Sequence, residues 1–272
     1  MRFDRSALAS RPNLGLADFL YESAAQEIAE RSGFTTRRFA NALYSGPALP
    51  SVFKFLSGAA GHWTVASPQH HPGVDVVADL ALPFRSRFDL AVSLNDLHLA
   101  DHPVRALAEI RGALAADGLF LGAVPATGTL GELTDALVHA EASVRGGASM
   151  RVAPLADVRS WGDAVARAGF ALPVADEVRL TVRYPTLGRL MDDLKHMGMR
   201  RVLAERHPAP RALFHEAEVY YRAQHADSDG RLRATFVLAY LSGWSPDPSQ
   251  QKPARRGSAT MSLEDALKRF GG

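Results

Sequence analysis

The stretch Arg87-Phe88-Asp89-Leu90-Ala91-Val92-Ser93-Leu94-Asn95-Asp96-Leu97-His98-Leu99 decides which fold this sequence predicts. After Asp89 the residues are apolar or small up to Leu94, which is typical of a strand that is covered on both faces of its sheet. Polar residues follow, and a helix is expected after them. In an open parallel α/β sheet, ligands bind where strands end and crossovers begin. The carboxyl end of this strand is therefore the first place to expect a small-molecule site.

The segments on either side of this stretch alternate between strand and helix signals. Besides 88–94, strands are predicted at 39–44, 62–66, 74–78, 119–124, 178–184 and 233–241. Helices are predicted at 18–31, 51–56, 101–114, 130–144, 155–168, 186–206, 210–225 and 262–270. This alternation predicts an α/β protein with a doubly wound, mostly parallel sheet of seven strands. A helical insertion before the last strand is typical of the Rossmann-like class I methyltransferase fold.

The order of these elements predicts four parts of the chain. We expect an N-terminal helical segment at 1–36, a methyltransferase-like Rossmann domain at 37–184 and 229–244, a helical cap at 185–228, and a C-terminal tail with a short helix at 245–272. Within the Rossmann domain, Thr129-Leu130-Gly131-Glu132 has the spacing of a capping box at a helix start. The loop Arg145-Gly146-Gly147 could either bind an anion through its backbone or act as a hinge next to the cap.

Composition limits the classes of function. The chain has 272 residues and no cysteine, which excludes disulfides and thiolate metal sites and predicts a reducing compartment. The amino terminus lacks the apolar segment of a secretory signal, so we expect a cytoplasmic protein. No run of about 18 apolar residues occurs, and no membrane span is expected.

The charged residues give no sign of a nucleic-acid or metal site. The formal net charge is +2, and basic pairs such as Arg37-Arg38, Arg200-Arg201 and Arg255-Arg256 are scattered along the chain. Scattered basic residues indicate an ordinary solvated surface, so no nucleic-acid partner is expected. His98 and His102 are four residues apart, but they do not resemble a metal site that is completed by a carboxylate. No metal site is therefore expected.

Several motifs resemble one family. From Val77 onward the sequence is similar to the methyltransferase-fold family that contains the respiratory complex I assembly factor five and its bacterial homologues. The resemblance is carried by these segments: Ala78-Asp79, Leu82-Pro83-Phe84, Phe88-Asp89-Leu90, Asp117-Gly118-Leu119-Phe120, Thr129-Leu130-Gly131-Glu132-Leu133, Arg145-Gly146-Gly147, Arg151-Val152-Ala153-Pro154, Leu190-Met191-Asp192-Asp193-Leu194 and Gly243-Trp244. It implies a class I fold that uses S-adenosylmethionine.

The resemblance also shows where this sequence departs from the pattern. In such proteins the first strand ends in an acidic residue and a glycine-rich turn, which lets the backbone approach the methionine part of the cofactor. Here the turn is Ser45-Gly46-Pro47, with one glycine and a proline that removes a donor. Ala66-Ser67-Pro68 stands where a second acidic residue would hold the ribose. Because two anchors are missing, S-adenosylmethionine binding is expected to be weak or lost.

Six residues are the candidates for cofactor binding. Asp79 matches the position near the adenine, and Asn95 and His98 follow the strand that opened this section. A plainer interpretation is open for four of them: Gly46 as a turn glycine, Asp79 as a solvated carboxylate, Asn95 as a helix start and His98 as a packed histidine. No catalytic base is identified. The candidate cofactor-binding residues are Gly46, Asp79, Leu80, Ser93, Asn95 and His98.

Two functional hypotheses follow. The first is an S-adenosylmethionine-dependent methyltransferase-family protein that acts on a protein or small molecule. The second is a catalytically inactive methyltransferase-like protein that serves as a binding or assembly factor related to a respiratory complex. Hydroxylation or another non-methyl reaction on the same fold is a further alternative, because a fold does not determine a function.

Overall fold

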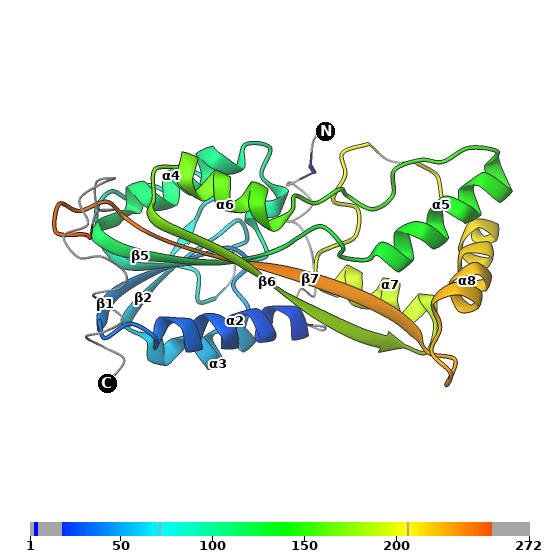
Figure 1. Ribbon diagram of the computed structural model, residues 1–272, viewed down its shortest axis with the longest axis horizontal. Coiled ribbons are helices and arrows are strands. Elements are labelled where there is room, and N and C mark those ends of the chain that lie inside the picture. The colour runs from blue at the N-terminus through cyan, green and yellow to red at the C-terminus, as the bar shows by residue number, and fades with distance from the viewer. Residues whose placement is uncertain (1–2, 5–17, 71, 206, 252–272) are drawn as a thin grey trace, which may run out of the picture.

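The computed structural model describes residues 3–4, 18–70, 72–205 and 207–251, and its centre is one seven-stranded sheet (Figure 1). The strands are β1 (Phe39–Ser45), β2 (Ala60–Ser67), β3 (Val76–Val77), β4 (Phe88–Leu94), β5 (Leu114–Pro125), β6 (Ala171–Tyr184) and β7 (Leu232–Trp244). Their order in the sheet is β3-β2-β1-β4-β5-β7-β6. The neighbours from β3 to β5 are parallel, and β7 is antiparallel to both β5 and β6. The predicted seven-stranded, mostly parallel sheet is confirmed.

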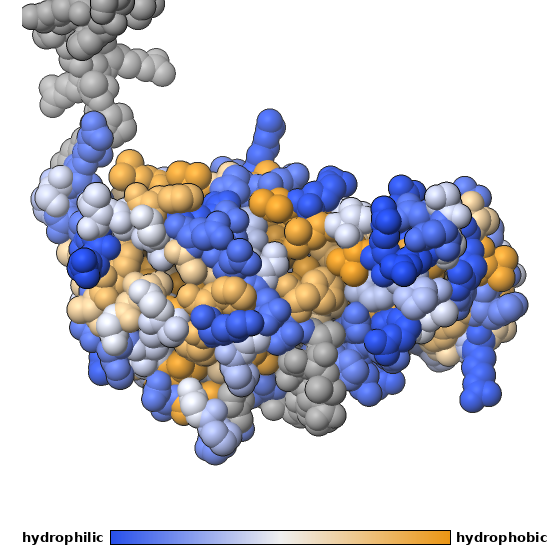
Figure 2. All heavy atoms as spheres, turned by 90° about the horizontal axis from the view of Figure 1, so that it is seen from below, coloured by the Kyte–Doolittle hydropathy of each residue, from blue (hydrophilic) through white to orange (hydrophobic). Residues whose placement is uncertain are grey.

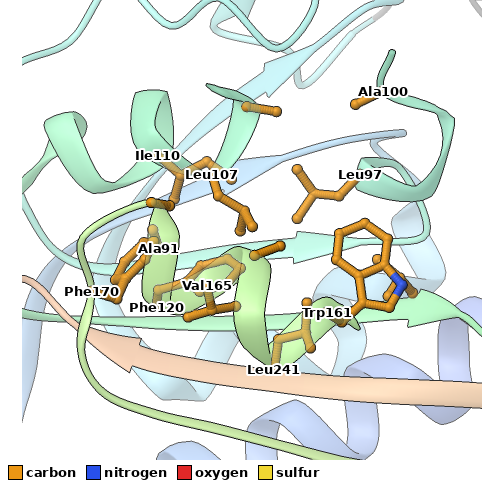
Figure 3. Close-up of a cluster of buried hydrophobic side chains, with 14 of the residues drawn as sticks. Ala91, Leu97, Ala100, Leu107, Ile110, Phe120, Trp161, Val165, Phe170 and Leu241 are labelled. Atoms are coloured by element: carbon orange, nitrogen blue, oxygen red, sulfur yellow. The ribbon is translucent and has the colours of Figure 1, made fainter. Parts of the chain in front are cut away.

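Helices cover both faces of this sheet, as Figure 1 shows. On one face lie α2 (Phe19–Ser32) and α3 (Pro50–Leu56), and on the other lie α4 (Pro103–Ala113) and α6 (Val158–Arg167). Figure 3 shows the second of these interfaces, where Leu107 and Ile110 of α4 and Val165 of α6 pack over Phe120 of β5. All four side chains are at most 1% exposed. Burial on both faces explains why β4 has a nearly continuous apolar sequence.

A second group of helices lies beyond the edge where the parallel strands end. It consists of α5 (Gly131–Arg145), α7 (Leu187–His196) and α8 (Arg211–His225), and we call it the helical lobe. The three helices share one hydrophobic cluster that includes Leu133, Leu190 and Tyr221. The β6–β7 ribbon runs from the sheet body into this lobe (Figure 1), and apolar side chains lie on the surface between the two in Figure 2.

The two cap helices predicted at 186–206 and 210–225 correspond to α7 and α8, but α7 ends at His196, well before the predicted end. α5 packs against α8. The boundaries predicted for the parts of the chain stay predictions. The last predicted helix, at 262–270, lies outside the described residues. After β4 the chain first forms a 3-10 turn, η2 (Leu97–Leu99), and α4 begins at Pro103.

The predicted capping box at Thr129 and Glu132 is wrong. Thr129 Oγ1 accepts a hydrogen bond from Val237 N–H and donates one to Val237 O, both at 3.0 Å. The Glu132 carboxylate accepts from Thr235 N–H at 3.1 Å and from the Thr235 hydroxyl. The reason is that β7 continues past the last residue of β5, Pro125, so these N–H groups have no strand partner there. The side chains of Thr129 and Glu132 therefore provide the hydrogen-bond acceptors for β7 beyond the end of β5.

We expect Thr129→Val to lower the free energy of unfolding by about 1–3 kcal/mol, because it leaves the buried Val237 N–H without its acceptor. Urea unfolding followed by circular dichroism measures this. Thr134→Val is the matched control, since the Thr134 side chain is exposed and its hydroxyl donates to Leu130 O. Equal destabilisation by the two substitutions would contradict the role given to Thr129.

Candidate functional site

The six predicted residues lie along the edge where the parallel strands end. Gly46 follows β1, Asp79 and Leu80 follow β3, and Ser93 and Asn95 lie at the end of β4. His98 is in η2 and is half-buried. Ser45 and Ser93 are partners in the β1–β4 register, so the ends of these two strands are adjacent. The structure thus brings the candidates to one edge, and their role in cofactor binding stays a prediction.

The turn after β1 is packed tightly against the end of β4. Gly46 has φ +144°, and a Cβ at this position would lie 3.2 Å from Leu94 O and 3.5 Å from Asp96 Cβ. Only glycine combines this backbone conformation with this approach. The Tyr44 hydroxyl donates to Pro47 O at 2.8 Å and holds the next residue of the turn. Burial raises the pKa of Tyr44 well above its ordinary value, so the phenol stays a donor.

The end of β4 buries three polar side chains almost in succession. Ser93 is 1% exposed, Asn95 is 7% exposed and Asp96 is 2% exposed. Among the described residues, Ser93 Oγ and Asn95 Oδ1 have no hydrogen-bond partner. A buried polar atom in this state costs about 1–3 kcal/mol and needs an explanation, such as a ligand that completes it. The residues at this edge therefore fit a polar ligand.

The loop after β3 forms the more open side of this edge. Asp79 is exposed, and Leu80 is half-buried with φ +59°, which is rare for a residue with a side chain. The loop is held by Ala78 N–H, which donates to Ser67 O at 2.9 Å. This places a carboxylate near the outer end of the strand edge, where solvent reaches it.

A cavity of about 620 Å³ adjoins the same edge. It begins at His98 and Leu99 and continues between the helical lobe and residues 150–153, 155, 199–203, 205 and 207–209. Its volume lies in the usual range for small-molecule sites. Among the six predicted residues, His98 is the one that lines it. Sequence reasoning missed this cavity because its walls are apolar positions from separate elements. They include Leu130, Leu133, Leu137, Met191, Leu194 and Phe214.

A buried ion pair fixes one wall of the cavity. Glu141 of α5 is fully buried, and its carboxylate accepts hydrogen bonds from Ser149 N–H and from Arg151, whose Nε lies 2.7 Å from Oε1. Arg151 also donates to Pro208 O at 2.8 Å. Burial opposes ionisation, but the hydrogen bonds from Ser149 and Arg151 outweigh it and hold the pKa of Glu141 below its ordinary value.

These contacts bear on the loop Arg145-Gly146-Gly147, for which the sequence left an anion site or a hinge open. Glu141 binds the residues on both sides of the two glycines, since it also lies 3.5 Å from Arg145 Nη1. The loop is therefore tied to α5 through one carboxylate.

None of the helices in the described ranges has the length and apolar composition that crossing a membrane requires. Across those same ranges, His, Asp and Glu side chains form no group of three that could hold a metal ion.

Sequence comparison finds close relatives, although no family model matches the chain. The human protein arginine-hydroxylase NDUFAF5 is 33% identical over 280 residues, which is 96% of this chain and 80% of that protein. The mouse protein of the same name is 33% identical over 98% of this chain and 82% of its own length. Malonyl-[acyl-carrier protein] O-methyltransferase of Laribacter hongkongensis is 33% identical over 63% of this chain and 56% of that protein.

Solved structures show the same fold. The YcgJ protein from Bacillus subtilis superposes with a TM-score of 0.55 at 12% identity, covering 83% of this chain and 99% of that one. BH2331 of Bacillus halodurans gives a TM-score of 0.53 at 13% identity with the same coverage. At this identity the likeness speaks for the fold alone.

Proposed function

Since the chain belongs to the NDUFAF5 family and is a methyltransferase-like protein, we propose that it binds S-adenosylmethionine. It transfers the methyl group of this cofactor to a substrate in the 620 Å³ cavity. The observation that carries the proposal is the junction at His98. There the cavity adjoins the end of β4, where Ser93 Oγ and Asn95 Oδ1 are buried and have no hydrogen-bond partner among the described residues. A cofactor site and a substrate site would share this boundary.

The residues at the carboxyl ends of β1 and β4 fit the polar and charged groups of the cofactor. Ser93 and Asn95 would supply polar side chains, and Gly46 would let the backbone come close. Asp79 would contribute its carboxylate from the exposed loop. When bound, S-adenosylmethionine supplies a methyl group on a positively charged sulfur. Titration with S-adenosylmethionine tests the expectation from the sequence that binding of this cofactor is weak or lost.

The residues of the chain would hold the substrate in place and keep water away from the methyl acceptor. Methyl transfer needs the acceptor atom held in line with the methyl group, and such positioning lowers the barrier by removing orientational freedom. His98 lies between the two sites and can hold a polar group of the substrate there. The apolar walls of the cavity, such as Leu133 and Leu194, exclude water from the acceptor atom. No side chain is assigned as a base.

Calorimetric titration of the full chain with S-adenosylmethionine tests the proposal. We expect saturable binding, and we expect Ser93→Ala to weaken it by about tenfold, because a hydrogen bond from the cofactor's polar end is lost. Without cofactor, Ser93→Ala should leave stability nearly unchanged, since its Oγ has no partner among the described residues.

Ser32→Ala is the matched control for this titration. Ser32 is also buried, but its hydroxyl donates to Ala29 O at 2.7 Å near the opposite edge of the sheet, so cofactor affinity should not change. A wild-type chain that gives no saturable isotherm would overturn the proposal and favour the inactive assembly-factor hypothesis.

Arginine hydroxylation is the second candidate, because several relatives carry that name. Mass spectrometry of a treated arginine-containing substrate distinguishes the two: methyl transfer adds a methylene unit, and hydroxylation adds an oxygen atom. Addition of oxygen without methylation would replace the methyl-transfer proposal.

A further inference from the structure

The edge of the sheet at β6 is long and uncovered. β6 is the last strand in the sheet order, and within the described ranges its 14 residues pair with β7 alone. Figure 1 shows it along the outer side of the β6–β7 ribbon. Its backbone N–H and C=O groups that point away from β7 therefore have no strand partner in the described part of the chain. A strand edge of this kind is a template for pairing with another strand.

Apolar side chains lie exposed along the same edge. Those on β6 itself are each at least 37% exposed, and they are Leu172, Val174 and Val178. Phe34, which follows the end of α2, is 82% exposed. Arg31 of α2 donates to both carboxylate oxygens of Asp176, at 2.5 and 2.8 Å, so the end of α2 is fixed beside β6. Exposed apolar side chains that gather in one region indicate an interaction surface.

Two charged residues near the middle of β6 have opposite signs. Glu177 and Arg179 flank Val178, and both are exposed. Neither forms an ion pair with another described residue. Because side chains alternate along a strand, the two lie on the same face of the sheet. Like charges directly opposite each other destabilise a pair of strands, whereas opposite charges stabilise it.

These signs make the edge complementary to itself. When a second copy pairs antiparallel about a two-fold axis at Val178, Glu177 of each copy lies opposite Arg179 of the other. Val174 of each copy likewise lies opposite Val182 of the other. The paired segment is 174–182 in both copies, so Pro173, which has no N–H to donate, lies outside it. A two-fold interface requires a surface that matches itself in this way.

We propose that this protein forms a homodimer in which the β6 strands of two copies pair antiparallel, centred on Val178. The two sheets then form one continuous sheet, and the charges of Glu177 and Arg179 are paired twice. No residue of β6 lines the 620 Å³ cavity, so the inference does not depend on the proposed methyl transfer.

Sedimentation velocity of the full chain over a dilution series tests the inference through a charge swap. We expect a dimer for the wild type. Glu177→Arg places arginines opposite each other at two symmetry-related positions, and Arg179→Glu does the same with glutamates. Each substitution should weaken the dimer by at least about tenfold. An equimolar mixture of the two variants should dimerise again, because one chain then carries only arginines and the other only glutamates at these positions.

Arg211→Glu is the matched control, since Arg211 is exposed on α8, away from β6, and this variant should dimerise as the wild type does. Restored dimerisation in the mixture also shows that both variants are folded. A second measurement is amide hydrogen exchange followed by mass spectrometry. The segment 171–184 should exchange more slowly in the wild-type dimer than in the Arg179→Glu variant.

Three results would overturn the inference. The first is a wild-type chain that stays monomeric throughout the dilution series. The second is a dimer whose affinity changes with neither charge reversal, or a mixture that remains monomeric. The third is a dimer in which exchange of the segment 171–184 is as fast as in the Arg179→Glu variant, because a different surface would then join the two copies.

Discussion

Replacing Arg151 by methionine should lower the free energy of unfolding by about 3–5 kcal/mol, because it leaves the carboxylate of Glu141 buried without its main cation. Glu141 is fully buried and the Arg151 side chain is 13% exposed. Methionine keeps much of the aliphatic volume of arginine, so the change removes charge more than packing. Chemical unfolding of the purified variant measures the loss.

Arg145→Met is the matched control for this substitution. Arg145 contacts the same carboxylate, but at 3.5 Å and with a side chain that is 38% exposed, so its loss should cost less than about 1 kcal/mol. Comparable destabilisation by both variants would show that Arg151 has no special role in fixing the cavity wall.

The ion pair between Glu141 and Arg151 also predicts that the free energy of unfolding depends on pH. The folded-state pKa of Glu141 lies below its ordinary value, so its ionised form contributes stability at neutral pH. This contribution is lost as the pH falls through that lowered pKa, since the carboxyl is then protonated in both states. The unfolding free energies of the wild type and Glu141→Gln should differ at pH 7 and converge in acid. A constant difference across this range would contradict the assignment.

Gly46→Ala should abolish or strongly weaken S-adenosylmethionine binding, by at least about tenfold. The φ of +144° costs an alanine about 1–3 kcal/mol, and its Cβ would press against Leu94 O at 3.2 Å. The turn and the end of β4 would have to separate, which displaces Ser93 and Asn95. Cofactor titration and chemical unfolding of the variant measure the two effects.

Gly73→Ala is the control that introduces backbone strain without a close contact of the new Cβ. Gly73 also has a positive φ, +91°, but among the described residues, its two chain neighbours aside, no heavy atom lies within 4 Å of the position its Cβ would take. This variant should lose some stability and keep its cofactor affinity. A similar loss of affinity in both variants would mean that general destabilisation, and not the approach of the turn to β4, is responsible.

The fold was largely predictable because strands buried on both faces have a clear sequence pattern. β4 was predicted at its observed bounds, since the residues after Asp89 are apolar or small up to Leu94 and a polar segment follows. β6 was predicted only from residue 178. Its first half contains Pro173 and the acidic pair Asp176-Glu177. It is a strand because β7 pairs with it from Ala171 to Tyr184, with an irregularity between Ala171 and Val174. Pairing with a distant partner leaves little local signal.

The site was predictable only in part, for a related reason. The alternation of strands and helices predicts a parallel sheet, so residues that follow the strands could be placed together at the carboxyl ends of the strands. The roles of Thr129 and Glu132 could not, because the local capping pattern competes with β7 backbone groups more than 100 residues away in sequence. The cavity walls could not be recognised either, since Leu133 and Met191 have the same apolar spacing as any core position.

The most direct measurement of the central claim is a crystal structure of the full chain with S-adenosylhomocysteine. The claim is that the β4 edge and the cavity at His98 form one cofactor-and-substrate site. We predict the ligand against Ser93 and Asn95, next to the Gly46 turn, with the cavity open beside it. A chain that crystallises without the ligand at saturating concentration, or with the ligand away from this edge, would contradict the account.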